Sequence, residues 1–147
     1  MFNHSRGFTL IELMIVVAIV AILASLAASI YVDAVSKSQV SEVFTITDGL
    51  KTNIAEYLGQ SGECPQLGKT SGFPSTPASY GGTYVSGIEI APIANGCSMT
   101  ATMRGTGSVT PKLIHQTVTI SLDATASNAQ WSCTSTVKPV YLPATCR

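Results

Sequence analysis

The chain has 147 residues, no formal net charge and a charged fraction of only 11%. This balance argues against a general nucleic-acid-binding protein, which would carry a basic patch or stripe. It also argues against a disordered chain, which combines high charge with low hydrophobicity. A single domain is expected at this length, with one strongly apolar block near the N-terminus and a remainder rich in Thr, Ser, Gly and Ala.

The apolar block follows a short polar start. Residues 1–7 carry Arg6 and the α-amino group as positive charges, and residues 13–32 contain no charged side chain. About 20 residues of helix measure ~30 Å, enough to span a hydrocarbon core. A segment in lipid must satisfy its own backbone groups, so this span is predicted to be helical. The preceding positive charge favours a cytoplasmic N-terminus and an external C-terminal part.

Glu12 is an acidic residue at the start of this block. A carboxylate at the bilayer centre costs about 2.5–3.5 kcal/mol on insertion scales. Glu12 either reaches the interface and favours the positive end of the helix dipole, or it awaits a cationic partner. Cleavage between Gly7 and Phe8 would supply that partner, because the new α-amino group of Phe8 is cationic near neutral pH. This amine would lie four residues before Glu12, on a similar helix face, and is equally able to pair with the Glu12 of a neighbouring subunit.

Residues 7–12 (Gly-Phe-Thr-Leu-Ile-Glu), followed by an unbroken apolar run, resemble the processing site of type IV pilins. The resemblance covers about residues 5–42 and includes Ser-Gln-Val-Ser-Glu at 38–42, which is typical of the major pilins. It implies that a membrane prepilin peptidase cuts after Gly7 and N-methylates Phe8. It also implies that Glu12 guides subunits into a growing fibre.

Two positions depart from the pattern of this family. Many members have Gly where this chain has Ala21, and Pro where it has Ser29. Ala is the best helix former and Ser lacks the steric clash of proline. We therefore expect the helix to stay more continuous in the fibre than is usual in the family.

From residue 32 the apolar residues follow a helical period of 3.6, which predicts one amphipathic helix continuous with the span, over residues 8–58. Gly59 and Gly62 are the expected terminators. The expected apolar stripe comprises Val32, Val35, Val40, Val43, Ile46 or Thr47, Leu50, Ile54, Tyr57 and Leu58. The expected polar face comprises Asp33, Ser36, Lys37, Ser41, Glu42, Thr45, Asp48, Thr52 and Glu56.

Residues 59–82 read as a loop rich in Gly, Pro, Ser and Thr. Four runs with period 2 follow, at 83–90, 97–104, 117–123 and 129–135. Such alternation predicts an antiparallel sheet with one buried face, laid on the apolar stripe of the helix. The resemblance implies the same α+β pilin fold: a long N-terminal helix packed on a four-stranded antiparallel sheet, with a C-terminal disulfide-bounded loop. The expected parts are a leader at 1–7, a transmembrane and assembly half-helix at 8–32, an amphipathic half-helix at 33–60 and a head at 61–147.

The four cysteines form no C-x-x-C pair, and a membrane-targeting N-terminus indicates disulfides in an oxidising compartment rather than zinc. Four cysteines allow three pairings. We predict Cys64–Cys97 and Cys133–Cys146. The second bridge resembles that of the major type IVa pilins and counts against a major pseudopilin of type II secretion.

The remaining chemistry-bearing residues show no arrangement typical of a catalytic, cofactor or metal site. His4 belongs to the expected leader, His115 lies in an expected turn, and Trp131 is expected in the core or at a subunit contact. No G-x-S-x-G turn orders a Ser, His and Asp. We therefore expect no enzyme, no cofactor and no metal.

The leading hypothesis is the major subunit of a type IV pilus, a helical homopolymer used for adhesion, twitching motility or DNA uptake. Its expected partners are identical subunits, the prepilin peptidase and methylase, the inner-membrane assembly machinery, and the inner membrane itself before assembly. Nucleic acid is expected to bind only through the assembled fibre. The alternatives are a minor pilin or pseudopilin and, with an ordinary signal peptide, a secreted disulfide-bonded binding domain.

Overall fold

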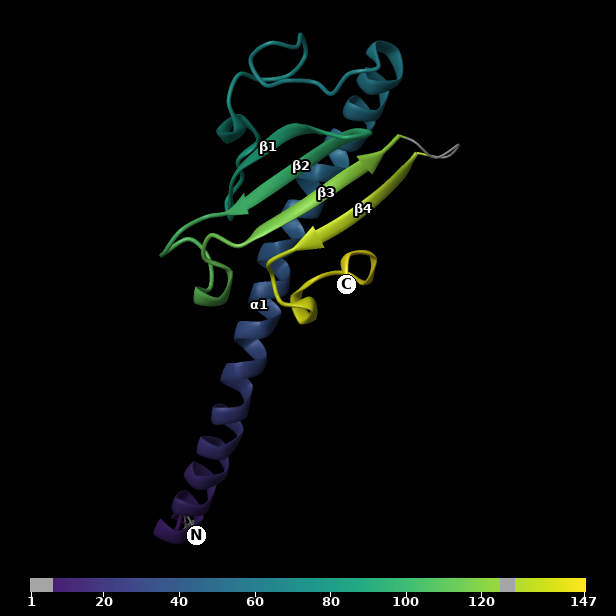
Figure 1. The fold of residues 1–147 in the computed structure, drawn as a ribbon. Helices are drawn as coiled ribbons and strands as arrows, with labels where there is room; N and C mark the ends of the chain where they lie inside the picture. The colour runs from purple at the N-terminus through teal and green to yellow at the C-terminus, as the bar shows by residue number, and fades with distance from the viewer. Residues whose placement is uncertain (1–6, 125–128) are drawn as a thin grey trace, which may run out of the picture. The chain divides into compact units, whose positions relative to one another are not determined.

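The computed structural model describes residues 7–124 and 129–147. Its principal elements are α1 (Leu10–Ser61), β1 (Val85–Ile93), β2 (Gly96–Met103), β3 (Thr117–Asp123) and β4 (Gln130–Ser135). The short 3₁₀ helices are η1 (Pro77–Tyr80), η2 (Pro111–Leu113), η3 (Pro139–Tyr141) and η4 (Ala144–Cys146). The chain forms two compact units, Met1–Ala34 and Val35–Arg147. The second unit, the head, contains the sheet and the C-terminal part of α1 (Figure 1).

The ends of α1 differ slightly from the expected 8–58. The helix begins at Leu10 because Thr9 caps it, and it continues past Gly59 to Ser61. Gly62 ends it in the left-handed region, with φ 73°, where a residue without Cβ is not strained. The Gly62 N–H donates to Leu58 O at 2.8 Å, which satisfies one of the last helical carbonyls.

Within the first unit, α1 runs without a break through residues 21–29. The hydroxyls of Ser25 and Ser29 donate to the carbonyls of Ile22 and Leu26, at 2.8 and 3.0 Å. The helix thus satisfies these polar side chains internally, as a segment in lipid requires. Continuity of this segment in an assembled fibre stays a prediction.

Of the predicted apolar stripe of α1, Val40, Val43, Leu50 and Ile54 are buried, whereas Val32 is exposed, contrary to the prediction. Ser36 is a second correction, because the sequence pattern placed it on the polar face and the structure buries it completely. Its hydroxyl lies 2.9 Å from Thr110 Oγ1, so the polar group is compensated inside the core. Gln39 beside it accepts a hydrogen bond from Thr110 N at 2.9 Å.

The sheet is four-stranded and antiparallel, as predicted, and its strand order is β1-β2-β3-β4. Its inner face carries the alternate residues expected from the sequence: Cys97, Met99, Ala101 and Met103 on β2 and Val118, Ile120 and Leu122 on β3 are all buried. The opposite face of these strands is mostly Ser and Thr. The head is thus a sheet whose apolar face covers the apolar stripe of α1 (Figure 1).

The two outer strands depart from simple alternation. In β1 the register with β2 shifts between Val85 and Gly87, so that Val85 and Ile88 both point inward. An extra residue of this kind is a β-bulge, and it interrupts the period-2 alternation expected over residues 83–90. In β4, Trp131 and Cys133 are half-buried as expected, whereas Ala129 is exposed and precedes the strand.

Candidate functional site

The sequence-predicted assembly residue, Glu12, lies in the first turn of α1 and is bonded to Thr9. Thr9 donates to Glu12 Oε2 from its backbone N–H at 2.9 Å and from its hydroxyl at 2.7 Å. In return, the Glu12 N–H donates to Thr9 Oγ1 at 3.3 Å. This reciprocal arrangement is a capping box, in which the residues at the N-cap and N3 positions satisfy each other's backbone donors. It holds the Glu12 carboxylate toward the start of the helix.

Sequence reasoning missed the role of Thr9. The T-x-x-E spacing before an apolar run is itself a signature of a helix start, so the signal was present. Gly7 and Phe8 precede the helix in non-helical, exposed chain, and the Phe8 side chain is 78% exposed. The bond expected to be cut therefore lies directly before the capped turn that carries Glu12.

The helix that follows this turn is apolar on every side. Leu13, Met14 and Ile15 are successive residues that point about 100° apart around α1, and they are 58%, 59% and 55% exposed. By length and composition, α1 is long and apolar enough to cross a membrane. A surface of this kind is stable against lipid or against other apolar helices, and not against water.

Two disulfides fix the head. Cys64, just after α1, is joined to Cys97 on β2. Cys133 on β4 is joined to Cys146 and closes the C-terminal loop. In the chain-entropy model, a disulfide that closes a loop of the size of the Cys133–Cys146 loop stabilises the folded state by about 3 kcal/mol.

No cluster of three His, Cys, Asp or Glu side chains that could hold a metal ion occurs among the described residues. His115, the one histidine within residues 7–124 and 129–147, lies in a turn with φ 54°. Its ring faces the Cα of Gly105, where a Cβ would lie 3.3 Å from His115 Cε1. Trp131 is half-buried, with Lys51 Nζ 5.7 Å from its ring centroid.

A capped, wholly apolar N-terminal helix and a disulfide-bonded α+β head together define a membrane-anchored subunit that is able to associate through its helix. Comparison with known families supports this class. A model described as "Pilin (bacterial filament)" matches residues 36–147. A second model, the prokaryotic N-terminal methylation motif, matches residues 2–28.

Several curated proteins are similar over nearly the whole chain. The fimbrial protein EcpC of Eikenella corrodens is 37% identical over 142 residues, which cover 97% of this chain and 90% of that protein. A fimbrial protein of Moraxella nonliquefaciens is 39% identical, covering 96% of both chains. The type IV major fimbrial protein FimA of Dichelobacter nodosus is 36% identical, covering 94% of this chain and 92% of its own.

Among solved structures, the crystal structure of a Cs1 pilin chimera has the same fold, with a TM-score of 0.56 and 21% identity over 79% of this chain and 99% of that one. The chain belongs to the pilin family. It is a structural subunit of a type IV pilus, held in a membrane by its apolar helix before it enters the fibre.

Proposed function

We propose that the chain is made as a precursor, cut between Gly7 and Phe8 by a prepilin peptidase, and N-methylated on Phe8. The match of residues 2–28 to the N-terminal methylation motif supports this. So does the position of the Gly7–Phe8 bond in exposed chain outside the helix. A peptidase needs its substrate backbone extended and accessible, and helical backbone offers neither.

In the mature chain, polymerisation follows from the apolar surface of α1. Apolar surface that moves from lipid into a bundle of identical helices stays shielded from water in both places. The free energy of helix association therefore comes from close packing and from polar contacts. Glu12 supplies the polar contact, because a carboxylate in an apolar bundle is stabilised by a cationic partner. The new α-amino group of Phe8, on the same or a neighbouring subunit, is that cation.

The single observation that carries this proposal is the capped carboxylate at the head of an otherwise unbroken apolar helix. Before assembly, the subunit spans the inner membrane once, with its N-terminus in the cytoplasm. The assembly machinery then extracts it from this membrane. The fibre then acts outside the cell in adhesion, twitching motility or DNA uptake. Any contact with nucleic acid is made by the assembled fibre.

Replacement of Glu12 tests the proposal and separates its two roles. Glu12→Gln keeps a side chain that caps a helix start, because Gln also serves at the N3 position, but it removes the charge. We expect Glu12→Gln and Glu12→Ala both to leave the protein in the membrane and to remove most surface fibres, measured as pilin in the sheared fraction. Normal fibre yield from Glu12→Gln would contradict the charge pairing.

A further inference from the structure

Two large aliphatic side chains are exposed in the described part of the head, Ile93 at 40% and Val140 at 51%. They belong to opposite ends of the sheet. Ile93 pairs with Gly96 at the turn between β1 and β2. At this same end β3 finishes and β4 begins, since Gly96 pairs with Asp123 and Asp123 with Gln130. Val140 lies in η3, beyond the other end of β4.

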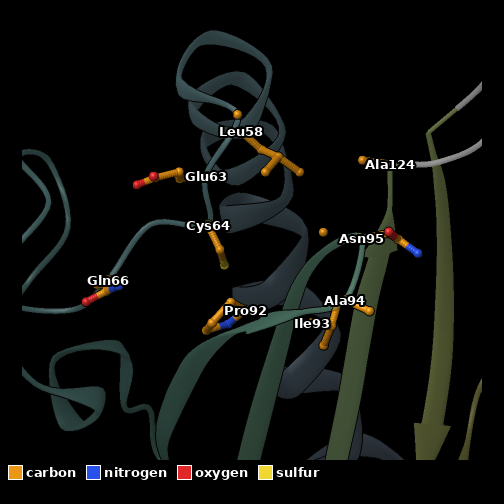
Figure 2. A pocket seen from close by; sticks show the side chains of 11 residues that line it. Leu58, Glu63, Cys64, Gln66, Pro92, Ile93, Ala94, Asn95 and Ala124 are labelled. Carbon is orange, nitrogen blue, oxygen red and sulfur yellow. The ribbon is translucent and has the colours of Figure 1, made fainter.

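A hollow of about 530 Å³ lies beside Ile93. Figure 2 shows the side chains of Leu58 and Cys64 pointing toward the β1–β2 turn, with Pro92 and Ile93 across from them and Glu63 at the rim. We call this space the hairpin hollow; its other lining residues are Gly62, Gln66, Ala94, Asn95, Gly96 and Ala124. Its walls are mainly apolar or uncharged, and Glu63 is the charged side chain that lines it.

At the other end of the sheet, residues 138–140 (Lys-Pro-Val) form an exposed segment, which we call the C-terminal knob. The next residue, Tyr141, is 5% exposed and packs the base of the knob into the core. The knob therefore offers a positive charge and an aliphatic side chain from one short, held segment.

Each end of the head carries both signs of charge, but cations predominate at the knob end, where Glu42 is bound to the backbone that leads into β1, and carboxylates predominate at the hollow end. At the knob end, Lys112 Nζ lies 5.6 Å from the Tyr141 ring, and Lys37 and Arg147 line a groove with Tyr141. At the hollow end Glu56 lies in the last turns of α1, Glu63 follows the helix and Asp123 ends β3, and all three are acidic. The α1–β1 loop also carries one cation, Lys69.

We propose that the C-terminal knob of one copy seats in the hairpin hollow of the next copy in the fibre, with Lys138 against Glu63 and Val140 beside Ile93. The inference rests on the proposed polymerisation. Charge complementarity selects the partner, because carboxylates predominate at the hollow end and cations at the knob end, and opposite potentials favour the correct register between two surfaces. Because the two surfaces lie at opposite ends of one head, a copy cannot fill its own hollow. Contacts of this head-to-tail type build open helical filaments and not closed dimers.

Each disulfide holds one of the two surfaces of this contact. Cys64–Cys97 ties the wall that follows Glu63 to β2, and Cys133–Cys146 closes the loop that carries the knob. Surfaces held before they meet lose less conformational entropy on association. The two bridges thus pre-organise the hollow and the knob separately.

Chemical cross-linking of native fibres tests the contact directly. A water-soluble carbodiimide joins a lysine amine to a carboxylate without a spacer, and peptide mass spectrometry identifies the joined residues. We expect fibres sheared from wild-type cells to yield a peptide that joins Lys138 to Glu63. Fibres that yield cross-links between subunits at other lysines, and none between Lys138 and Glu63, would overturn the proposal.

Charge-reversal variants of Lys138 and Glu63 test the same contact genetically. We expect Lys138→Glu and Glu63→Lys each to lower the ratio of sheared to total pilin by about tenfold, and the double reversal to restore it, because like charges repel and opposite charges attract across the contact. Glu89→Lys, in the middle of β1, makes the same change in net charge as Glu63→Lys away from both surfaces and is expected to leave the ratio unchanged. Single reversals that assemble like wild type, or a double reversal no better than either single one, would contradict the contact.

These outcomes are distinct from a failure of the proposed function. If wild-type cells form no fibre from this chain, polymerisation itself is wrong. If wild-type fibres form and the Lys138–Glu63 pair is missing by both tests, polymerisation stands and the knob-in-hollow contact falls.

Discussion

The carboxylate of Glu42, on α1, accepts a hydrogen bond from the backbone N–H of Tyr84 at 2.6 Å. The same carboxylate accepts from Thr83 N at 2.7 Å and from Val85 N at 3.2 Å. Three successive backbone donors that lead into β1 are therefore bound to one side chain of the helix. Glu42 thus fixes where the first strand begins relative to α1, a role more specific than the exposed polar position that its periodicity predicted.

Removal of this carboxylate should destabilise the head. Hydrogen bonds to a charged group contribute roughly 1.5–3 kcal/mol each, less in partly exposed positions. We expect Glu42→Ala to lower the free energy of unfolding of the full chain in detergent by about 2 kcal/mol, and Glu42→Gln to lower it by less, because one amide oxygen still accepts. Glu56→Ala, on the exposed side of the same helix, is the matched control. Equal melting temperatures for Glu42→Ala and Glu56→Ala would refute the role.

Gly82 is coupled to the same carboxylate. A Cβ at this position would lie 2.7 Å from Glu42 Cδ and 3.1 Å from Oε2, too close for an unchanged side chain. We expect Gly82→Ala to destabilise the wild-type head and to cost much less in a Glu42→Ala background, because the obstacle has been removed. Thermal unfolding of the two single variants and the double variant measures this coupling. Strictly additive effects would show that the clash is relieved elsewhere.

Thr9 should matter through the capping box. Loss of a Thr or Ser N-cap typically costs about 0.5–2 kcal/mol of helix stability. We expect Thr9→Ala to lower fibre yield to a level between wild type and Glu12→Ala, and Thr9→Ser to keep it, because the serine hydroxyl occupies the same place. The ratio of sheared to total pilin reports the result. A Thr9→Ala strain with wild-type yield would mean that Glu12 needs no positioning.

Ionisation of Tyr80 should contribute to the loss of stability of the head at alkaline pH. Burial raises the pKa of the Tyr80 phenol above its ordinary value of 10.0. The unfolded chain therefore ionises at this residue before the folded chain does, so the stability from Tyr80 is complete below pH 10 and declines as the pH rises further. We expect the Tyr80→Phe variant to lose less stability than wild type between neutral and strongly alkaline pH. Parallel pH profiles of melting temperature would exclude this contribution.

The fold was predictable to a large extent because its elements obey simple periods. The alternation in β2 and β3 places Met99 and Ile120 inward, and the structure buries both. Irregular geometry was not predictable in the same way. The bulge at Val85/Gly87 reverses the phase of β1 within two residues, and no local composition sets where such an extra residue falls.

The residues of the candidate site also differ in how far the sequence could predict their roles. Glu12 stands out because a charge in an apolar run is costly, and that argument needs no structure. The roles of Ser36 and Glu42 were not predictable from the sequence, because their partners, Thr110 and residues 83–85, lie far away in the chain. Polar residues that bond across the fold look identical, in sequence, to polar residues on a wet surface. The hairpin hollow and the C-terminal knob were not predictable for the same reason, because only the topology of the folded sheet shows that they lie at opposite ends.

The central claim is that the polymerising form of this chain begins at Phe8 and keeps its apolar helix. The intact mass of the principal protein in fibres sheared from the cell surface tests it most directly. We expect a mass equal to residues 8–147 with one added methyl group and four thiol protons removed. A protein that retains residues 1–7, or one that lacks the apolar helix altogether, would contradict it.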